Sequence, residues 1–314
     1  MKTQLIGKSS LLSTRLAYGC WRIVGTWEPN EVTPQRIEQG QRAIIAAYEA
    51  GYTLFDHADI YCSGICETVF GEVLKQIGGM RNRILIATKC GIRFSGQPDP
   101  SAPYRYDFSR QHILSSCEQS LKRLGIETID LYQLHRPDYL MDPCEVAEAF
   151  DQLRKAGKVR EFGVSNFNPS QFSTLQKHLA MPLIVNQVQI SLGDLHCFED
   201  GTLDQCVADG ITPMAWSPLA GGYLGTGATV DPKHPRRDAL LKLLALMDRL
   251  AAKYSTTRTN IALAWLLKHP SHIVPIIGSA QPDRIREATR ADSIDLTRED
   301  WYALLEAARA QRLP

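Results

Sequence analysis

Short apolar runs alternate along the chain with longer stretches in which apolar residues recur every three or four positions. Short runs of β-branched and aromatic residues are typical of buried strands, whereas the longer spacing is typical of amphipathic helices. Eight runs fit the strand pattern, namely Arg15–Tyr18, Tyr52–Phe55, Ile84–Thr88, Ile129–Leu134, Glu161–Val164, Leu183–Gln187, Thr212–Trp216 and Ile273–Ile277. Strands that alternate with helices indicate a parallel sheet. Eight such units predict an α/β fold that closes as a (β/α)8 TIM barrel.

Helical spacing fills several segments between these runs. The predicted helices are Ile37–Ala50, Arg110–Leu124, Pro143–Ala156 and Pro169–Gln176. Proline suits the first turn of a helix, and Asp107 or Ser109 can cap the second of these helices. A one-sided apolar stripe from Leu240 to Tyr254 predicts another helix after the seventh strand.

Both ends of the chain carry additional predicted elements. Gln4–Ile6 and Ser10–Leu12 flank Gly7–Lys8, a pattern that predicts an N-terminal β-hairpin able to close the bottom of the barrel. Arg298–Ala310 has helical spacing and is expected to pack across one end. No linker or low-complexity tract divides the sequence, so residues 1–314 are expected to form one domain. A barrel of roughly 250 residues leaves room for these additions.

An open sheet with a Rossmann nucleotide site is the main alternative to the barrel. That fold requires a Gly-x-Gly-x-x-Gly turn after an early strand. The first predicted strand leads instead into Gly19, Cys20 and Trp21. The pair Gly78–Gly79 follows a predicted helix, where it is expected to form the C-terminal turn. The missing fingerprint favours the barrel.

Charge and composition exclude some classes of partner. The chain has 35 Lys and Arg residues against 34 Asp and Glu residues, so there is no general electrostatic attraction to nucleic acid or to an anionic membrane. No apolar stretch approaches the roughly 18 residues of a membrane span, and the first residues lack the apolar region of a signal peptide. We therefore expect a cytoplasmic protein with a small-molecule partner. The eight cysteines follow no regular spacing and are expected to be reduced thiols.

The residues that end or follow the predicted strands are mostly polar or glycine. Catalytic groups of such barrels lie at the carboxyl ends of the strands and in the loops that follow. These positions hold Gly19, Asp56, Lys89, His135, Ser165, Asn166, Gln187, Trp216, Ser217, Gly278 and Ser279. A closed barrel would bring them together on one rim.

Asp56, Tyr61, Lys89 and His135 make a chemically coherent set at this rim. A tyrosine phenol has an ordinary pKa of about 10, and a lysine cation beside it would lower that pKa towards neutrality. Lys89 can supply the cation, Asp56 its counter-charge, and His135 a hydrogen bond to a substrate oxygen. An ion pair or loop packing would explain each residue singly, but the four together favour a catalytic site.

Metal-dependent hydrolysis is the alternative chemistry for such a barrel. It requires several His and carboxylate ligands, whereas this chain has His57 beside Asp59 and otherwise isolated histidines. Cys62 and Cys66 are spaced like one pair of zinc ligands, but the sequence has no matching second pair. No metal site is expected, and His57 is expected to pack against or support the site.

Longer motifs resemble the aldo-keto reductase family over almost the whole chain. They read FDHADIYCSGICETVFGEVL, ILIATKCGIR, SLKRLGIETIDLYQLHRPD, GKVREFGVSNFNPSQF, VNQVQIS, MAWSPLAGGYLG and PIIGSAQPDRIREA. The residues in these motifs resemble those of a bacterial branch of NADPH-dependent oxidoreductases. The resemblance implies a barrel that binds NADPH without a Rossmann fold and reduces aldehydes or ketones to alcohols by hydride transfer.

The resemblance also implies a role for each matching position. Tyr61 would be the general acid, Lys89 and Asp56 its tuning pair, and His135 the group that orients and polarises the carbonyl. Ser165, Asn166 and Gln187 match positions that hold the nicotinamide carboxamide, and Trp216 matches the ring stacked on the nicotinamide. The implied cofactor-binding residues are Gly19, Cys20, Trp21, Ser165, Asn166, Gln187, Trp216, Ser217, Pro218, Leu219, Gly222, Gly278, Ser279, Arg284 and Glu287.

Two segments would hold the phosphates of the cofactor. Ser217–Gly222 matches the loop over the pyrophosphate, where small residues allow a close approach of the backbone, and Arg284 can stack on adenine or meet a phosphate. The chain departs from many members at Gly278 and Ala280, which stand where a lysine or arginine lies near the 2′-phosphate, and at Ala288, which replaces an adenine-binding Asn. We expect the protein to bind NADPH in preference to NADH, so the cofactor is NADP rather than NAD.

Two questions stay open at this stage. A cofactor-binding regulatory or redox-sensor subunit with little turnover is the alternative to an enzyme, although the intact set of four favours catalysis. Aromatic residues of the predicted loops either line a pocket for an apolar or aromatic carbonyl substrate or only pack the loops together. They are Trp21, Trp27, Phe94, Tyr104, Tyr106 and Phe198. A monomer is expected from the family resemblance.

Overall fold

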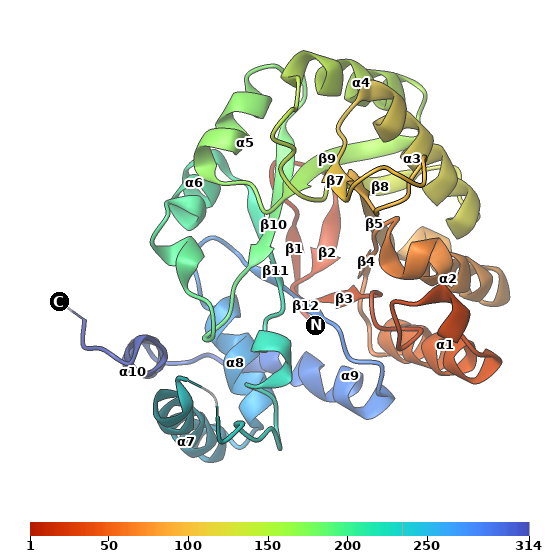
Figure 1. Cartoon of the computed structure of the whole chain (residues 1–314). Coiled ribbons are helices and arrows are strands. Elements are labelled where there is room, and N and C mark those ends of the chain that lie inside the picture. The colour runs from red at the N-terminus through yellow and green to blue at the C-terminus, as the bar shows by residue number, and fades with distance from the viewer. Residues whose placement is uncertain (234, 314) are drawn as a thin grey trace.

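Eight parallel strands close into a barrel surrounded by helices in the computed structural model, which describes residues 1–233 and 235–313 (Figure 1). In order around the barrel the strands are β3 (Ala17–Gly19), β4 (Leu54–Asp56), β5 (Leu85–Cys90), β8 (Ile129–Leu134), β9 (Val159–Ser165), β10 (Leu183–Gln189), β11 (Thr212–Trp216) and β12 (Val274–Ile277). Pairing of β12 with β3 completes the ring. The predicted (β/α)8 barrel is confirmed, and each predicted strand overlaps an observed one.

The helices pack on the outside of this barrel. They are α1 (Pro34–Glu49), α2 (Ile65–Gln76), α3 (Arg110–Leu124), α4 (Pro143–Lys155), α5 (Pro169–Gln176), α6 (Thr202–Asp209), α7 (Arg237–Lys253), α8 (Arg258–Leu267), α9 (Pro282–Ala288) and α10 (Arg298–Arg309). Ser109 caps α3 by accepting a hydrogen bond from the His112 N–H, and Pro143 and Pro169 open α4 and α5. These local signals explain why the predicted bounds of α3 and α5 agree with the structure.

An N-terminal hairpin closes the bottom of the barrel, as predicted. Its strands are β1 (Thr3–Leu5) and β2 (Leu12–Thr14), so the second strand begins two residues later than predicted. Ile6 and Leu11 of the connecting turn join the cluster of buried residues that fills the barrel interior. The Gly7 N–H donates to the Thr212 hydroxyl at 2.7 Å. The opposite end of the barrel, where the strands end, is therefore left for a site.

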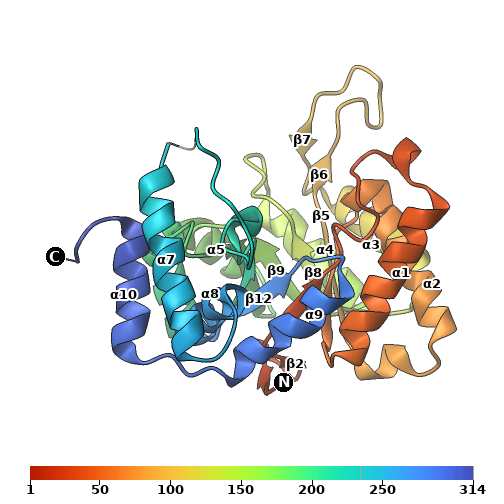
Figure 2. The same cartoon turned by 90° about the horizontal axis from the view of Figure 1, so that it is seen from below.

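Helix α10 packs beside α7 and α8 on the outside of the barrel (Figure 2). The expectation that it lies across an end of the barrel is wrong. The Trp301 ring stacks on that of Trp265 in α8, with 5.0 Å between ring centroids, and each indole N–H donates to the backbone carbonyl of the other residue. A paired tryptophan contact on α8 thus fixes where the helix lies.

Helix α2 ends at Gln76, and Gly78–Gly79 form the turn after its C-cap residue Ile77, as predicted. Another feature was not predicted from the sequence. A small hairpin of β6 (Ile92–Arg93) and β7 (Arg105–Tyr106) projects from the end of the barrel opposite the N-terminal hairpin (Figure 2). Two-residue strands are too short to show a periodic pattern, so the sequence did not reveal this hairpin.

The cysteines are all free thiols, as predicted, and Cys144 alone among them is exposed. Among the described residues, no helix is long and apolar enough to cross a membrane. Within the same part of the chain, no three His, Cys, Asp or Glu side chains are grouped so that they could hold a metal ion.

Candidate active site

The four predicted catalytic residues meet at the carboxyl ends of three neighbouring strands. Asp56 is the last residue of β4, Lys89 lies near the end of β5, and His135 follows β8 directly. Tyr61 begins a short 3-10 turn, Tyr61–Gly64, in the loop after β4. Because the neighbouring strands are in register, these residues reach the same rim.

Lys89 is the centre of the hydrogen-bond network at the rim. Its Nζ donates to both carboxylate oxygens of Asp56 at 2.8 Å and to the His57 carbonyl at 2.6 Å. The same Nζ lies 3.2 Å from the Tyr61 hydroxyl oxygen. Because Lys89 can only donate, the phenol oxygen accepts this bond and the phenol O–H stays available to another acceptor. Lys89 and Asp56 are both buried, so each needs the other as its counter-charge.

The Tyr61 phenol keeps its proton in this environment. Burial and the nearby Asp56 carboxylate raise the pKa of Tyr61 well above its ordinary value. The expectation that Lys89 brings this pKa towards neutrality is wrong, because burial, followed by the Asp56 carboxylate, outweighs the effect of the lysine cation. The arrangement presents a protonated phenol at the barrel mouth.

His135 is held as a neutral imidazole next to this phenol. Burial and the charges of Lys89 and Arg136 lower the pKa of His135 well below its ordinary value. Its ring centroid lies 6.1 Å from that of Tyr61, and its Nδ1 is buried without a partner among the described residues. A neutral imidazole carries one N–H donor, so it can bind the same oxygen that the phenol protonates.

His57 takes no part in this network through its side chain. Its buried ring packs against Phe70 with 4.5 Å between ring centroids, and burial lowers the pKa of His57 to about 3. The expected packing role for this histidine is confirmed.

A chain of hydrogen bonds connects the predicted nicotinamide-binding residues to Asp56. Ser165 Oγ donates to the Gln187 carbonyl at 2.7 Å, and the Asn166 amide donates to Ser165 Oγ at 2.8 Å. Trp216 Nε1 donates to Asn166 Oδ1 at 3.0 Å, and Gln187 Nε2 donates to Asp56 Oδ1 at 2.8 Å. The ends of β9, β10 and β11 are thereby connected to Asp56, one of the four predicted catalytic residues.

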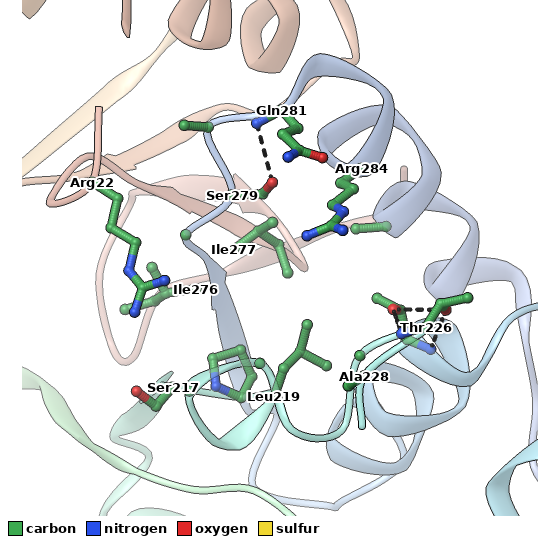
Figure 3. Close-up of a pocket in the computed structure, with 18 of the residues that line it drawn as sticks. Arg22, Ser217, Leu219, Thr226, Ala228, Ile276, Ile277, Ser279, Gln281 and Arg284 are labelled. Carbon is green, nitrogen blue, oxygen red and sulfur yellow. Dashed lines mark hydrogen bonds between the residues drawn. The ribbon is translucent and has the colours of Figure 1, made fainter. Parts of the chain in front are cut away.

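A cavity of about 930 Å³ extends from this rim between β12, α9 and the loop after β11 (Figure 3). Nine of the predicted cofactor-binding residues line it, namely Trp21, Ser217, Pro218, Leu219, Gly222, Gly278, Ser279, Arg284 and Glu287. Gly19 is buried in β3, and Cys20 has no exposed surface. Cys20 belongs to the hydrophobic core, so the structure does not bring it to the cavity as the resemblance implied.

The cavity fits a long molecule that carries phosphate groups. Gly221 and Gly222 have positive φ, and nothing lies within 4 Å of where a Cβ would stand, so their backbone is open to close approach. Figure 3 shows the Arg22 and Arg284 side chains pointing into the cavity. Neither guanidinium forms an ion pair with any residue that the structure describes. A flexible glycine turn with two free cations is a suitable cradle for a dinucleotide.

Sequence reasoning missed several residues of this cavity. Arg22 lies against the Trp21 ring, with 4.3 Å between Cζ and the ring centroid, and Gln281 and Thr226 also line the space. Its place directly after Trp21 could have suggested Arg22. Thr226 could not be inferred, because it lies in an irregular segment far from any strand end. One carboxylate oxygen of the predicted residue Glu287 is already occupied, because Thr257 Oγ1 and Asn260 Nδ2 both donate to its Oε1 at 2.6 Å.

The aromatic residues of the loops divide into two groups. Phe198 packs against Trp265 and Trp301, away from the mouth, so it is a packing residue. The Trp27 ring lies edge-on to Tyr61, with 6.0 Å between centroids, and Tyr104 contacts both Phe94 and Tyr106 in the β6–β7 hairpin. Among these five, Trp27 alone makes a ring contact with one of the four predicted catalytic side chains, that of Tyr61.

Comparison with known proteins decides what kind of enzyme carries this site. A sequence model described as the Aldo/keto reductase family matches residues 15–309. The chain belongs to this family. It is 40% identical to the 6-dehydroglucose reductase of Novosphingobium aromaticivorans, over 98% of this chain and 96% of that protein. It is 38% identical to the uncharacterized oxidoreductase YcsN of Bacillus subtilis, over 96% of each.

A solved structure agrees with this family assignment. The glycerol dehydrogenase of Gluconobacter oxydans superposes with a TM-score of 0.85 at 26% identity, over 98% of this chain and 95% of that one. Aldo/keto reductases are oxidoreductases that act on carbonyl compounds and use nicotinamide cofactors. This aldo/keto reductase therefore has the fold and the general activity that its motifs implied.

Proposed function

We propose that this aldo/keto reductase reduces aldehydes or ketones to alcohols with NADPH and that Tyr61 is the general acid. One observation carries the proposal: the Tyr61 hydroxyl accepts a hydrogen bond from Lys89 at 3.2 Å beside the neutral His135. A substrate carbonyl oxygen placed between Tyr61 and His135 would receive two hydrogen bonds. As negative charge develops on that oxygen, the phenol would donate its proton to it.

The cofactor would lie along the cavity with its reactive end at the rim. When bound, it supplies the hydride that the protein itself cannot provide. Ser165, Asn166 and Gln187 would orient the carboxamide end, and Trp216 would stack on the ring. The Ser217–Gly222 loop would hold the pyrophosphate by its backbone. Proton transfer from Tyr61 would leave a phenolate, which the adjacent Lys89 cation stabilises.

The preference for NADPH is supported by the charges at the far end of the cavity. Arg284 lies there without an ion-pair partner among the described residues, next to Ser279 and Gln281. A guanidinium and neighbouring polar groups suit a 2′-phosphate. This set stands in place of the lysine or arginine that many members carry where this chain has Gly278 and Ala280.

Polyhydroxylated aldehydes are the substrate class that we propose first. The relative from Novosphingobium aromaticivorans is named for 6-dehydroglucose, and it matches this chain over almost its whole length. The partner would then be a small carbonyl compound, with no nucleic acid or membrane involved. Action as a cytoplasmic monomer stays a prediction.

Replacement of Tyr61 by Phe tests the proposed function. Tyr61→Phe removes the proton donor but leaves the Lys89–Asp56 pair, so we expect unchanged NADPH binding. The rate constant kcat for aldehyde reduction should fall by about 100- to 10,000-fold, the usual contribution of a general acid. Binding is measured by titration of protein fluorescence, and turnover by NADPH absorbance with a panel of aldehydes, diketones and quinones.

Tyr302→Phe in α10 is the matched control and should behave as the wild type, because Tyr302 is exposed and distant from the rim. Full turnover in Tyr61→Phe would refute the role of Tyr61. Tight NADPH binding by the wild type without turnover on any carbonyl compound would instead favour a regulatory or sensor subunit.

A further inference from the structure

Arg136 lies close to the proposed catalytic residues at the mouth of the barrel. It follows His135 directly, and its Cζ lies 5.5 Å from the ring centroid of Trp216. Burial raises the pKa of the Tyr61 and Tyr104 hydroxyls, and the Arg136 charge opposes this rise; after burial and Lys89, the same charge also helps to lower the pKa of His135. The guanidinium is therefore within electrostatic reach of the catalytic phenol and of the β6–β7 hairpin at once. It does not line the cofactor cavity.

The guanidinium of Arg136 has no protein acceptor in the described part of the chain. It forms no ion pair or hydrogen bond there, and its only contact of this kind is with the Trp216 ring. The neighbouring arginines of the hairpin differ, because Arg93 pairs with Asp107 at 2.7 Å and Arg105 donates to the Gln97 carbonyl at 2.7 Å. Arg136 thus keeps all five N–H donors for solvent or a ligand.

The nearest carboxylate in the sequence is already engaged. Asp138 accepts from the Phe108 N–H through Oδ2 and from the Leu140 N–H through Oδ1, both at 2.9 Å. These bonds tie the loop after β8 to the base of the hairpin, so they support the loop that carries Arg136. Neither Asp138 nor Asp142, the other carboxylate of this loop and the cap of α4, forms an ion pair with the guanidinium.

We propose that Arg136 determines substrate specificity by binding acceptor oxygens on carbons close to the reacting carbonyl. The inference rests on the proposed function and names Arg136 as the residue that selects, among carbonyl compounds, those that carry hydroxyl or carboxylate oxygens. Guanidinium groups bind such oxygens through paired N–H donors. Trp216 lies against one face of the guanidinium and is itself held by Asn166, so the N–H edge of Arg136 is oriented within electrostatic reach of Tyr61 and His135.

Three aldehydes of similar length separate the possibilities. Glyceraldehyde carries hydroxyls, succinic semialdehyde carries a carboxylate, and butanal carries neither. Steady-state kinetics with NADPH would give kcat and KM for each on the wild type, Arg136→Met and Arg136→Lys. We expect the wild type to prefer at least one oxygenated aldehyde over butanal. In Arg136→Met this preference, as a ratio of kcat/KM values, should fall about tenfold to a hundredfold, mainly through KM.

The variants also identify the kind of oxygen that is bound. If Arg136→Met loses the preference over butanal only for succinic semialdehyde, and Arg136→Lys partly restores it, Arg136 binds a carboxylate, because lysine keeps the charge. Loss confined to glyceraldehyde, without rescue, would support hydroxyl recognition by the planar fork. Arg83→Met is the matched control, since Arg83 is an exposed arginine just before the opposite end of β5, and it should leave all three ratios unchanged.

An equal loss on all three aldehydes in Arg136→Met would overturn the inference, because Arg136 would then act only on the catalytic groups or on folding. A wild type that reduces all three equally well would also overturn it, while leaving the proposed function intact. A wild type that reduces no carbonyl compound would overturn both.

Discussion

At the scale of single residues, the rim keeps the Lys89–Asp56 pair charged and holds its tyrosine and two histidines neutral. Burial lowers the pKa of Lys89, and the Asp56 carboxylate opposes this effect. The same buried cation helps to keep His57 and His135 unprotonated. A neutral donor and a protonated phenol therefore coexist within a few ångströms of a lysine ammonium. Such a combination suits donation of a proton to an oxygen that becomes negative during the reaction.

Asp59 makes the stability of the protein depend on pH. Burial, followed by the nearby Glu67 carboxylate, raises the pKa of Asp59 to about 8, and its Oδ1 is enclosed without a hydrogen-bond partner among the described residues. Below about pH 4 this carboxyl is protonated in both the folded and the unfolded chain. Between pH 4 and pH 8 the unfolded chain releases the proton while the folded chain keeps it, so stability falls as pH rises.

We therefore expect Asp59→Asn to flatten the pH dependence of the unfolding free energy. One pKa unit corresponds to about 1.4 kcal/mol. Between pH 4.5 and pH 8.5 the unfolding free energy of the wild type should therefore fall by several kcal/mol more than that of the variant. Urea unfolding at a series of pH values measures it. Asp238→Asn changes an exposed carboxylate and should leave the slope as it is. Parallel curves for Asp59→Asn and the wild type would show that Asp59 ionises normally.

At the scale of elements, the N-terminal hairpin depends on one glycine. Gly7 has a φ of +53°, and a Cβ there would overlap the carbonyl oxygen of Ile184 in β10. Gly51 also has a positive φ, +86°, but nothing lies within 4 Å of a Cβ at that position. The two glycines therefore separate backbone strain from steric overlap.

Gly7→Ala should destabilise the fold more than Gly51→Ala does. Left-handed backbone costs an alanine about 1–2 kcal/mol, and overpacking adds a further ~1–3 kcal/mol. We expect Gly51→Ala to show only the first cost and Gly7→Ala to show both, as measured by denaturant unfolding. An equal loss in the two variants would mean that the hairpin moves away from β10 at little cost.

Element prediction worked where a local signal marks the boundary. Proline and a side-chain cap fix the start of α5, since Asn168 and Gln171 form a reciprocal capping box there. The turn that carries Tyr61 lacks such a signal, because Cys62 and Ser63 adopt positive φ although neither is glycine. The hairpin of β6 and β7 was missed for another reason, since its two-residue strands are too short to show a periodic pattern.

At the scale of the whole molecule, the barrel converts strand ends that are distant in sequence into one rim. For this reason Asp56, Lys89 and His135 could be placed from the sequence once eight strands were recognised. The far end of the cavity could be placed only in part, because Arg284 followed from the family resemblance whereas Thr226 lies in an irregular segment whose path depends on tertiary packing. Tertiary packing also decides which arginines form no ion pair with a carboxylate. Arg286, two residues beyond Arg284, pairs with Asp283 and Glu49 instead.

The cofactor preference can be tested on the stability of the whole protein. A ligand that binds only the folded state stabilises it by RT ln(1 + [L]/Kd), about 2.7 kcal/mol at a hundred times Kd. NADPH should therefore raise the thermal midpoint of unfolding more than NADH does at equal concentration. Arg284→Met should abolish most of that difference while leaving the smaller effect of NADH.

Arg286→Met removes an arginine from the same helix that is already paired with carboxylates, so it should keep the difference between the two cofactors. Raised salt concentration should weaken the effect of NADPH more than that of NADH, because screening acts on the additional phosphate charge. Equal stabilisation of the wild type by both cofactors would mean that Arg284 does not read the 2′-phosphate. The glycine and alanine at positions 278 and 280 would then mark a cavity that accepts NADH equally well.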